Sequence, residues 1–246
     1  MGVVRNEDRV TMSIQGLLVS VTVICLTVIT YSHAKTVIFQ PPPLTSYVNY
    51  HTNVAAELAN LGHDVWISLP HFMLERNILK DKPIKIVEYG KELGNIELML
   101  YKNTAVLDKF WAGESSPNFF SLYATAVEFI KIAPQVLSEK SFIDKVKSLK
   151  PDLIVVESVP FNMNMVVLPY MLDIPFALIG TIHDVIQSKV PFSPGTTPFP
   201  SDSWSDSMTF FQRVKSTLIY LARINFDLFH DSSFVSRFAP HKPYKP

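Results

Sequence analysis

The chain has 246 residues, a length that suits one large domain or two small ones. Hydrophobic residues make up 48% of it, which supports a substantial core, and Lys plus Arg equal Asp plus Glu at 22 each. This balance excludes the strongly basic field with which proteins attract nucleic acid, so no nucleic-acid partner is expected.

An apolar segment near the N-terminus predicts a secretory signal peptide over residues 1–34. Leu17–Tyr31 is apolar apart from Ser and Thr, two arginines precede it, and the small residues Ser32 and Ala34 follow. The segment is shorter than the roughly 18–20 residues of a spanning helix, although an uncleaved membrane anchor is the alternative. In either case the chain is expected to enter the secretory pathway, in the endoplasmic reticulum lumen or associated with a membrane. It would be secreted if the signal is cleaved and no anchor follows.

The stretch from Lys35 to Pro70 predicts a strand, a helix and a second strand. An apolar run at Thr36–Phe39 indicates the first strand, and Ser46 follows where a helix N-cap is expected. Apolar residues at helical spacing lead to Gly62, which suits the left-handed end of a helix, and Val65–Leu69 indicates the second strand. Such a crossover joins parallel strands, and open α/β sheets place their chemistry at the carboxyl ends of these strands.

Several kinds of cofactor site are excluded by the motifs that the sequence lacks. The loop Pro41–Ser46 contains no glycine, so it is not the Gly-x-Gly-x-x-Gly fingerprint of dinucleotide binding. Cys25 is the only cysteine and lies in the predicted signal segment, which excludes thiol catalysis and cysteine metal sites in the mature chain. No His-Glu-x-x-His pattern suggests a metal. No cofactor is therefore predicted.

Strands and helices are expected to alternate along the rest of the chain. The wholly apolar run Leu153–Val156 is typical of a strand in the middle of a parallel sheet. This alternation predicts an α/β domain with helices on both faces of the sheet. The further expected elements are the strands Ile84–Tyr89 and Phe176–Ile179 and the helices Phe119–Ile132, Ser141–Leu149, Phe161–Leu172 and Met208–Phe229.

Several stretches, in their order and spacing, carry a family resemblance. They are KTVIF from Lys35, Leu61-Gly62-His63-Asp64-Val65, Pro151–Glu157, Asp173–Phe176, and Ser205–Phe210 with Arg213. Together they resemble the N-terminal half of a lumenal UDP-glycosyltransferase of the animal UDP-glucuronosyltransferase type. The resemblance implies the N-terminal domain of a GT-B fold, a Rossmann-like parallel sheet that binds the acceptor, over residues 35–230. It also implies that residues 231–246 are a truncated linker toward a missing donor domain, which would bind the UDP-sugar.

The same resemblance implies where the catalytic residues lie, with two departures. Tyr47 stands where the family has its base His, and Glu157 stands where the family has the Asp that pairs with it. A tyrosine with a pKa of about 10 cannot act as that base unaided, so Tyr47 is either a hydrogen-bond donor to the acceptor or an ordinary helix aromatic. His51, one turn further along, is a candidate substitute base. Glu157 is either a base for acidic acceptors such as phenols or a structural strand-end carboxylate.

An acceptor pocket is expected to be apolar with few polar groups. Aromatic residues of the middle of the chain fall where family members build such a pocket, and packing in the core is the alternative for them. The predicted pocket residues are Ser46, Phe110, Trp111, Phe119, Phe120, Tyr123 and His183.

The resemblance implies transfer of a hexose or glucuronic acid from a UDP-sugar to a small lipophilic acceptor. Because the donor half is expected to be absent, the chain would act only in a full-length context and would be inactive alone. The alternative is a non-catalytic module or truncated pseudoenzyme. Such a module would hold a lipophilic ligand or associate with full-length transferases.

Overall fold

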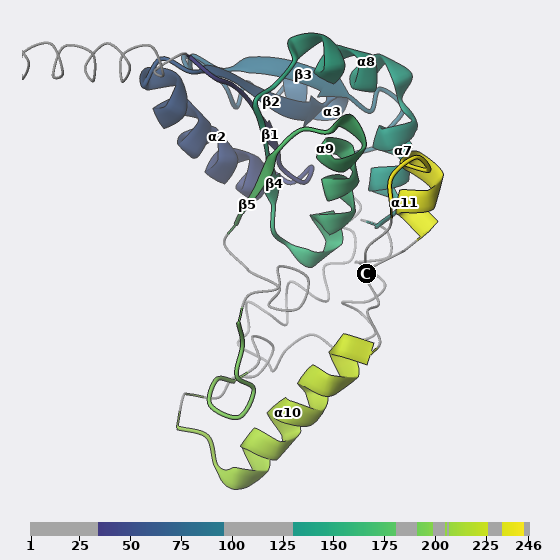
Figure 1. Ribbon diagram of the computed structural model, residues 1–246. Coiled ribbons are helices and arrows are strands. Elements are labelled where there is room, and N and C mark those ends of the chain that lie inside the picture. Colours follow the sequence, from purple (N-terminus) through teal and green to yellow (C-terminus); the bar gives the residue numbers. More distant parts are fainter. Residues whose placement is uncertain are drawn as a thin grey trace, which may run out of the picture. The chain divides into compact units, whose positions relative to one another are not determined.

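The computed structural model describes residues 34–95, 130–180, 191–198, 205, 207–225 and 233–243 (Figure 1). The chain divides into two units, Met1–Ala34 and Lys35–Pro246, and every element named below belongs to the second. The predicted signal segment Leu17–Tyr31 lies outside the described residues. None of the helices in the described ranges combines the length and hydrophobicity that a membrane span requires.

Five parallel strands form a sheet in the order β3-β2-β1-β4-β5 (Figure 1). All strands predicted from the sequence are confirmed, with small differences at their ends. Because every neighbouring pair is parallel, the carboxyl ends of all these strands lie along one edge of the sheet. The strands are β1 (Thr36–Gln40), β2 (Asp64–Pro70), β3 (Lys85–Tyr89), β4 (Leu153–Glu157) and β5 (Phe176–Ile179).

Helices cover both faces of this sheet. Val37 and Phe39 of β1 point into one apolar cluster, while Ile38 between them points into the other. The first cluster is closed by α2 (Thr45–Asn60) and α3 (His71–Leu74). The second is closed by α7 (Ile132–Ser138), α8 (Lys140–Leu149), α9 (Val167–Leu172) and α11 (Ser233–Phe238). The predicted fold class, a Rossmann-like parallel sheet with helices on both faces, is therefore confirmed.

The two ends of α2 differ in how well they were predicted. The prediction that Ser46 caps the helix is wrong, because α2 begins at Thr45 and Leu44 takes the N-cap position without a side-chain hydrogen bond. A contact distant in sequence holds this end, since the Arg76 guanidinium donates to the Thr45 hydroxyl over 2.6 Å. At the other end Gly62 has a φ of 91°, which confirms the left-handed helix end.

Two predicted helices have different boundaries in the structure, and a third is hardly described. The one predicted at Phe161–Leu172 is split into a 3-10 helix, η1 (Pro160–Val166), and α9. The one predicted at Met208–Phe229 is α10 (Phe210–Asn225) over the described residues. Its start is a reciprocal cap, because the Gln212 amide oxygen accepts from the Thr209 N–H over 2.7 Å and the Thr209 hydroxyl accepts from the Gln212 N–H over 3.4 Å. The predicted helix Phe119–Ile132 lies almost wholly outside the described residues.

The segment 233–243 lies in the range for which a linker is predicted. In the structure Phe234 of α11 is buried in the second apolar cluster. The Tyr170 hydroxyl of α9 donates to the Pro243 carbonyl over 2.6 Å, and Lys242 forms an ion pair with Asp173. This segment therefore packs on α9 as part of the domain.

Candidate functional site

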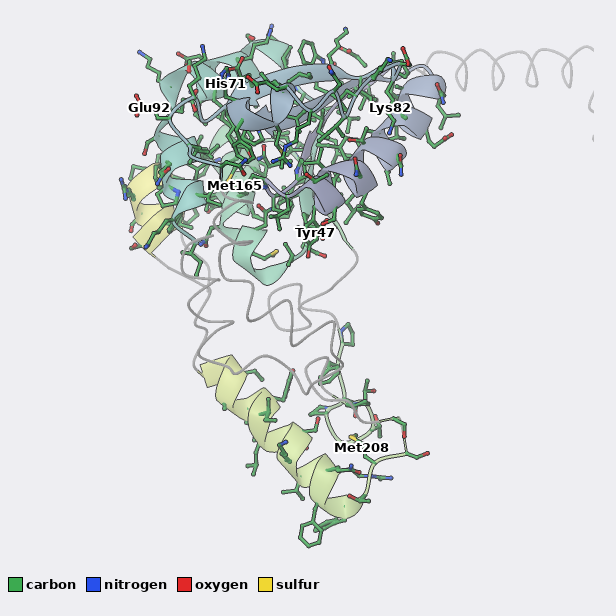
Figure 2. All side chains as sticks on the ribbon, turned by 180° about the vertical axis from the view of Figure 1, so that it is seen from behind. Tyr47, His71, Lys82, Glu92, Met165 and Met208 are labelled. Carbon is green, nitrogen blue, oxygen red and sulfur yellow. The ribbon has the colours of Figure 1, made fainter. Side chains whose placement is uncertain are left out.

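The carboxyl ends of β1 and β4 bring the candidate catalytic residues together. These two strands are neighbours, with Gln40 at the end of β1 beside Val156, and Glu157 is the last residue of β4. After β1 a short loop leads into α2, whose first two turns carry Tyr47 and His51. Figure 2 shows Tyr47 at the N-terminal end of this helix. Residues distant in sequence thus meet at the edge of the sheet where open α/β folds place their chemistry.

His51 and Glu157 form a pair that is completely enclosed by protein. The His51 Nε2 and Glu157 Oε2 atoms are 2.8 Å apart, and both side chains have an exposed fraction of 0%. The rings of Phe39 and Tyr50 pack edge-on against the imidazole at centroid distances of 5.8 and 5.7 Å. The imidazole therefore holds the carboxylate in place and does not itself face solvent.

The second oxygen of Glu157 lies in a tightly restricted space. Within the described part of the chain, Oε1 is buried and has no hydrogen-bond partner. A Cβ atom added to Gly180, the residue after β5, would lie 1.9 Å from this oxygen. Only glycine leaves room here for the carboxylate, and the requirement is one of space, because it comes from a close approach of the two residues.

A buried asparagine fastens the two strand ends that form the site. The Asn162 side-chain amide donates to the backbone carbonyls of Glu157 and Gln40, at 3.4 and 3.5 Å. Sequence reasoning missed both Asn162 and Gly180. The available signals were an amide within an otherwise apolar predicted helix and a glycine directly after a strand, and neither indicates its partner.

The half-buried Tyr47 lies within the electrostatic reach of this pair. Its burial, and to a lesser extent the negative charge of Glu157, raise the pKa of the Tyr47 hydroxyl above its usual value. The phenol therefore stays protonated at neutral pH and can donate a hydrogen bond. The arrangement supplies a neutral hydroxyl within electrostatic reach of a buried carboxylate that an imidazole orients.

One of the predicted pocket residues lies within the described part of the chain, and the others lie outside it. Ser46 is exposed in the first turn of α2. The other predicted pocket residues, Phe110, Trp111, Phe119, Phe120, Tyr123 and His183, lie outside the described residues. Within the described ranges no three His, Cys, Asp or Glu side chains form a group that could hold a metal ion.

Solved structures of glycosyltransferases resemble parts of this chain at low sequence identity. The calicheamicin glycosyltransferase CalG4 is 12% identical with a TM-score of 0.45, and the match covers 85% of this chain and 41% of that one. The spinosyn rhamnosyltransferase SpnG is 17% identical with a TM-score of 0.40, and the match covers 59% of this chain and 34% of that one. The chain thus spans less than half the length of either protein. Among proteins of curated function no match was found.

A family profile gives the stronger comparison. The family described as UDP-glucoronosyl and UDP-glucosyl transferase matches residues 36–239, which include all five strands of the sheet and both partners of the buried pair. This span is most of the chain. The chain therefore belongs to the UDP-glycosyltransferase family.

Proposed function

We propose that this chain is the acceptor-binding half of a UDP-glycosyltransferase. In a full-length context it would transfer a hexose or glucuronic acid from a UDP-sugar to a small lipophilic acceptor, and alone it would be inactive. The observation that carries the proposal is the buried His51–Glu157 pair beside Tyr47, at the strand edge where this fold places its chemistry. The family match supports glycosyl transfer as the reaction type.

The proposed reaction is an inverting displacement at the anomeric carbon. The acceptor oxygen forms a bond to that carbon while the bond to UDP breaks, and UDP leaves with the bonding electrons. The acceptor's proton must go to a base. Tyr47, being neutral, donates a hydrogen bond that positions the acceptor, and Glu157 is the candidate base for acceptors that lose a proton easily, such as phenols. His51 is a positioning residue, which fixes the carboxylate through its 2.8 Å contact.

A non-catalytic module that binds a lipophilic ligand is the second candidate. The family resemblance places Tyr47 at the position of the family's base His, and one observation favours this candidate: the pKa of Tyr47 is raised, so the phenol stays protonated and cannot take a proton unaided. Such a module would keep the acceptor pocket and lose the transfer step. It would act in association with full-length transferases.

Calorimetry on the purified chain tests the proposal with two ligands, UDP and the phenolic compound 1-naphthol. Naphthol binding without UDP binding is expected for an acceptor half. UDP binding that equals or exceeds naphthol binding would contradict the assignment to that half. Absence of both, in a chain whose circular dichroism shows it folded, would contradict the acceptor site itself.

A matched pair of variants tests the role of Tyr47. Tyr47→Phe removes only the hydroxyl and should weaken naphthol binding by about five- to tenfold, the usual worth of one hydrogen bond. Tyr50→Phe makes the same change on the same helix and should leave the affinity unchanged. In a chain joined to a donor half, Tyr47→His should raise transfer to aliphatic alcohols more than to phenols, because phenols lose their proton more easily. Equal activity of both proteins would mean that the base is not limiting.

We also propose that the chain enters the secretory pathway and resides in the endoplasmic reticulum or is secreted from it. The predicted signal segment Leu17–Tyr31 supports this. Expression in cells with a secretory pathway, followed by N-terminal sequencing, tests it. Lys35 as the first residue of the mature chain is expected, and an intact Met1 would indicate an anchor or no translocation.

A further inference from the structure

The helix α10 exposes apolar side chains along one side. Its apolar stripe consists of Phe210, Phe211, Val214, Leu218, Leu221 and Ile224, and every one of these side chains is exposed. Phe211 is exposed to 81% and Leu218 to 61%. In α8, by contrast, Phe142, Ile143 and Val146 are all buried against the sheet. Packing in the core therefore does not explain the amphipathic pattern of α10, and a binding surface is the alternative.

The stripe lies on one side of α10. At roughly 100° per residue its six side chains fall within an arc of about 140°. Ser216, which is fully buried, lies roughly opposite the middle of this arc. The ring of Tyr220 contacts Phe192 at a centroid distance of 5.5 Å and also lies outside the arc. Ser216 and Tyr220 thus lie on a side of α10 other than the one that carries the stripe.

Basic residues border the stripe on both sides. The sequence of α10 contains Arg213, Lys215 and Arg223 and no Asp or Glu. On the helix Arg213 follows one border of the arc, next to Ile224, and Lys215 follows the other, beyond Phe211. The Arg213 Nε donates to the Met208 carbonyl over 3.1 Å. Arginine and lysine at such borders can lay their methylene groups along an apolar surface while their charged ends reach outward.

We propose that the apolar stripe of α10 lies in the surface of an anionic phospholipid membrane, parallel to it. Phe and Leu on one face, with basic residues at the border and no acidic residue, are the composition of interfacial helices. Lipid phosphates and anionic headgroups would attract the two flanking cations. A second copy of the chain is a poorer occupant, because its stripe would bring basic borders against basic borders. This contact is separate from the predicted N-terminal segment and does not depend on the proposed function.

Local fluorescence tests the proposal in the full chain, where the N-terminal segment alone could bind vesicles. An environment-sensitive fluorophore is attached at Leu218→Cys in a Cys25→Ser background. The matched control carries it at Asp144→Cys, an exposed position of α8. With phosphatidylcholine vesicles that contain phosphatidylserine, the Leu218 label should shift to the blue and be quenched by lipid-attached nitroxides. The Asp144 label should do neither.

Charge variants and apolar variants separate the two parts of the interaction. Lys215→Gln should lower the partition coefficient, obtained by titrating the Leu218 label with vesicles, about fivefold with phosphatidylserine present, since one cation near an anionic surface is worth about 1 kcal/mol. It should have little effect on vesicles of phosphatidylcholine alone. Phe211→Glu should abolish insertion of the label. Leu61→Glu places the same charge at another exposed apolar side chain, 75% exposed, and should leave insertion unchanged.

Two results would overturn the proposal. One is a Leu218 label that stays in water while the protein is bound to vesicles. The other is a label that already lies in an apolar environment without vesicles. Sedimentation would then distinguish a dimer, in which a second copy covers the stripe, from a monomer in which the chain itself covers it.

Discussion

Removing His51 should destabilise the fold strongly, because it leaves the Glu157 carboxylate buried without its partner. In the variant His51→Leu the apolar leucine fills a similar volume but provides no hydrogen bond. The two wild-type side chains are 2.8 Å apart and neither is exposed, so water cannot replace the lost contact. Breaking such a buried pair costs about 3–5 kcal/mol. Typical domains have a free energy of unfolding of about 5–15 kcal/mol, so this is a large share of it.

Urea denaturation followed by circular dichroism measures this effect. With a slope of about 2 kcal/mol per molar urea, the midpoint of unfolding should fall by roughly 1.5–2.5 M. The double variant His51→Leu with Glu157→Leu removes both polar groups and should recover most of the lost stability, because an apolar pair of similar volume is often neutral. His63→Leu is the matched control, since this half-buried side chain accepts one hydrogen bond from the Lys35 N–H over 3.2 Å. It should cost about 1 kcal/mol or less.

Two outcomes would refute this reasoning. If His51→Leu unfolds within about 0.5 M urea of the wild type, the carboxylate is not held by the imidazole in solution. If the double variant is as unstable as the sum of the two single variants, the residues contribute independently, and the pair is not an energetic unit.

Three further predictions concern other buried or charged groups. Gly180→Ala should cost about 1–3 kcal/mol in urea denaturation by forcing the Glu157 carboxylate aside, whereas Gly195→Ala, with nothing within 4 Å of its added Cβ, should be nearly neutral. Burial raises the pKa of Tyr89, so only the unfolded chain releases this proton just above pH 10, and the free energy of unfolding should fall as the pH rises above about 10. Tyr89→Phe should remove part of that fall in a pH series of urea midpoints, and an unchanged slope would contradict the prediction. A backbone hydrogen bond from β1 lowers the pKa of Asp152, so its contribution is present above about pH 4 and lost on acidification. Asp152→Asn should therefore flatten the acid limb of the stability profile, and a steeper limb would contradict this.

The strands could be predicted from sequence because the information that forms them is local. Thr36–Phe39 and Leu153–Val156 are short apolar runs bounded by residues that interrupt regular structure, and both are strands in the structure. Gly62 marked the end of a helix because few other residues adopt its φ of 91°. The family resemblance rested on such local stretches as well, and the family profile matches most of the chain.

The start of α2 could not be predicted because distant contacts decide it. Ser46 has the right chemistry for a cap, but the helix begins two residues earlier than that cap predicts, at Thr45, whose hydroxyl accepts a hydrogen bond from Arg76. In the same way, α11 lies within residues 231–246, which the family resemblance implied to be a linker. Phe234 nevertheless packs in the apolar core with residues of α9. The local sequence pattern carries no information about the surface on which such a segment packs.

By itself the sequence determined the strands, the α/β class and the family, because each depends on short local patterns and on their order along the chain. It also marked Glu157 and His51 as separate candidates. Only the tertiary structure decided that they are partners, since 106 residues separate them and the pairing of β1 with β4 brings them together. The pairing of β4 with β5 places Gly180 against the carboxylate, and Asn162 bonds to the carbonyls of both Gln40 and Glu157. A buried polar group is stabilised by a hydrogen-bond partner. Packing in three dimensions decides which residue provides that partner.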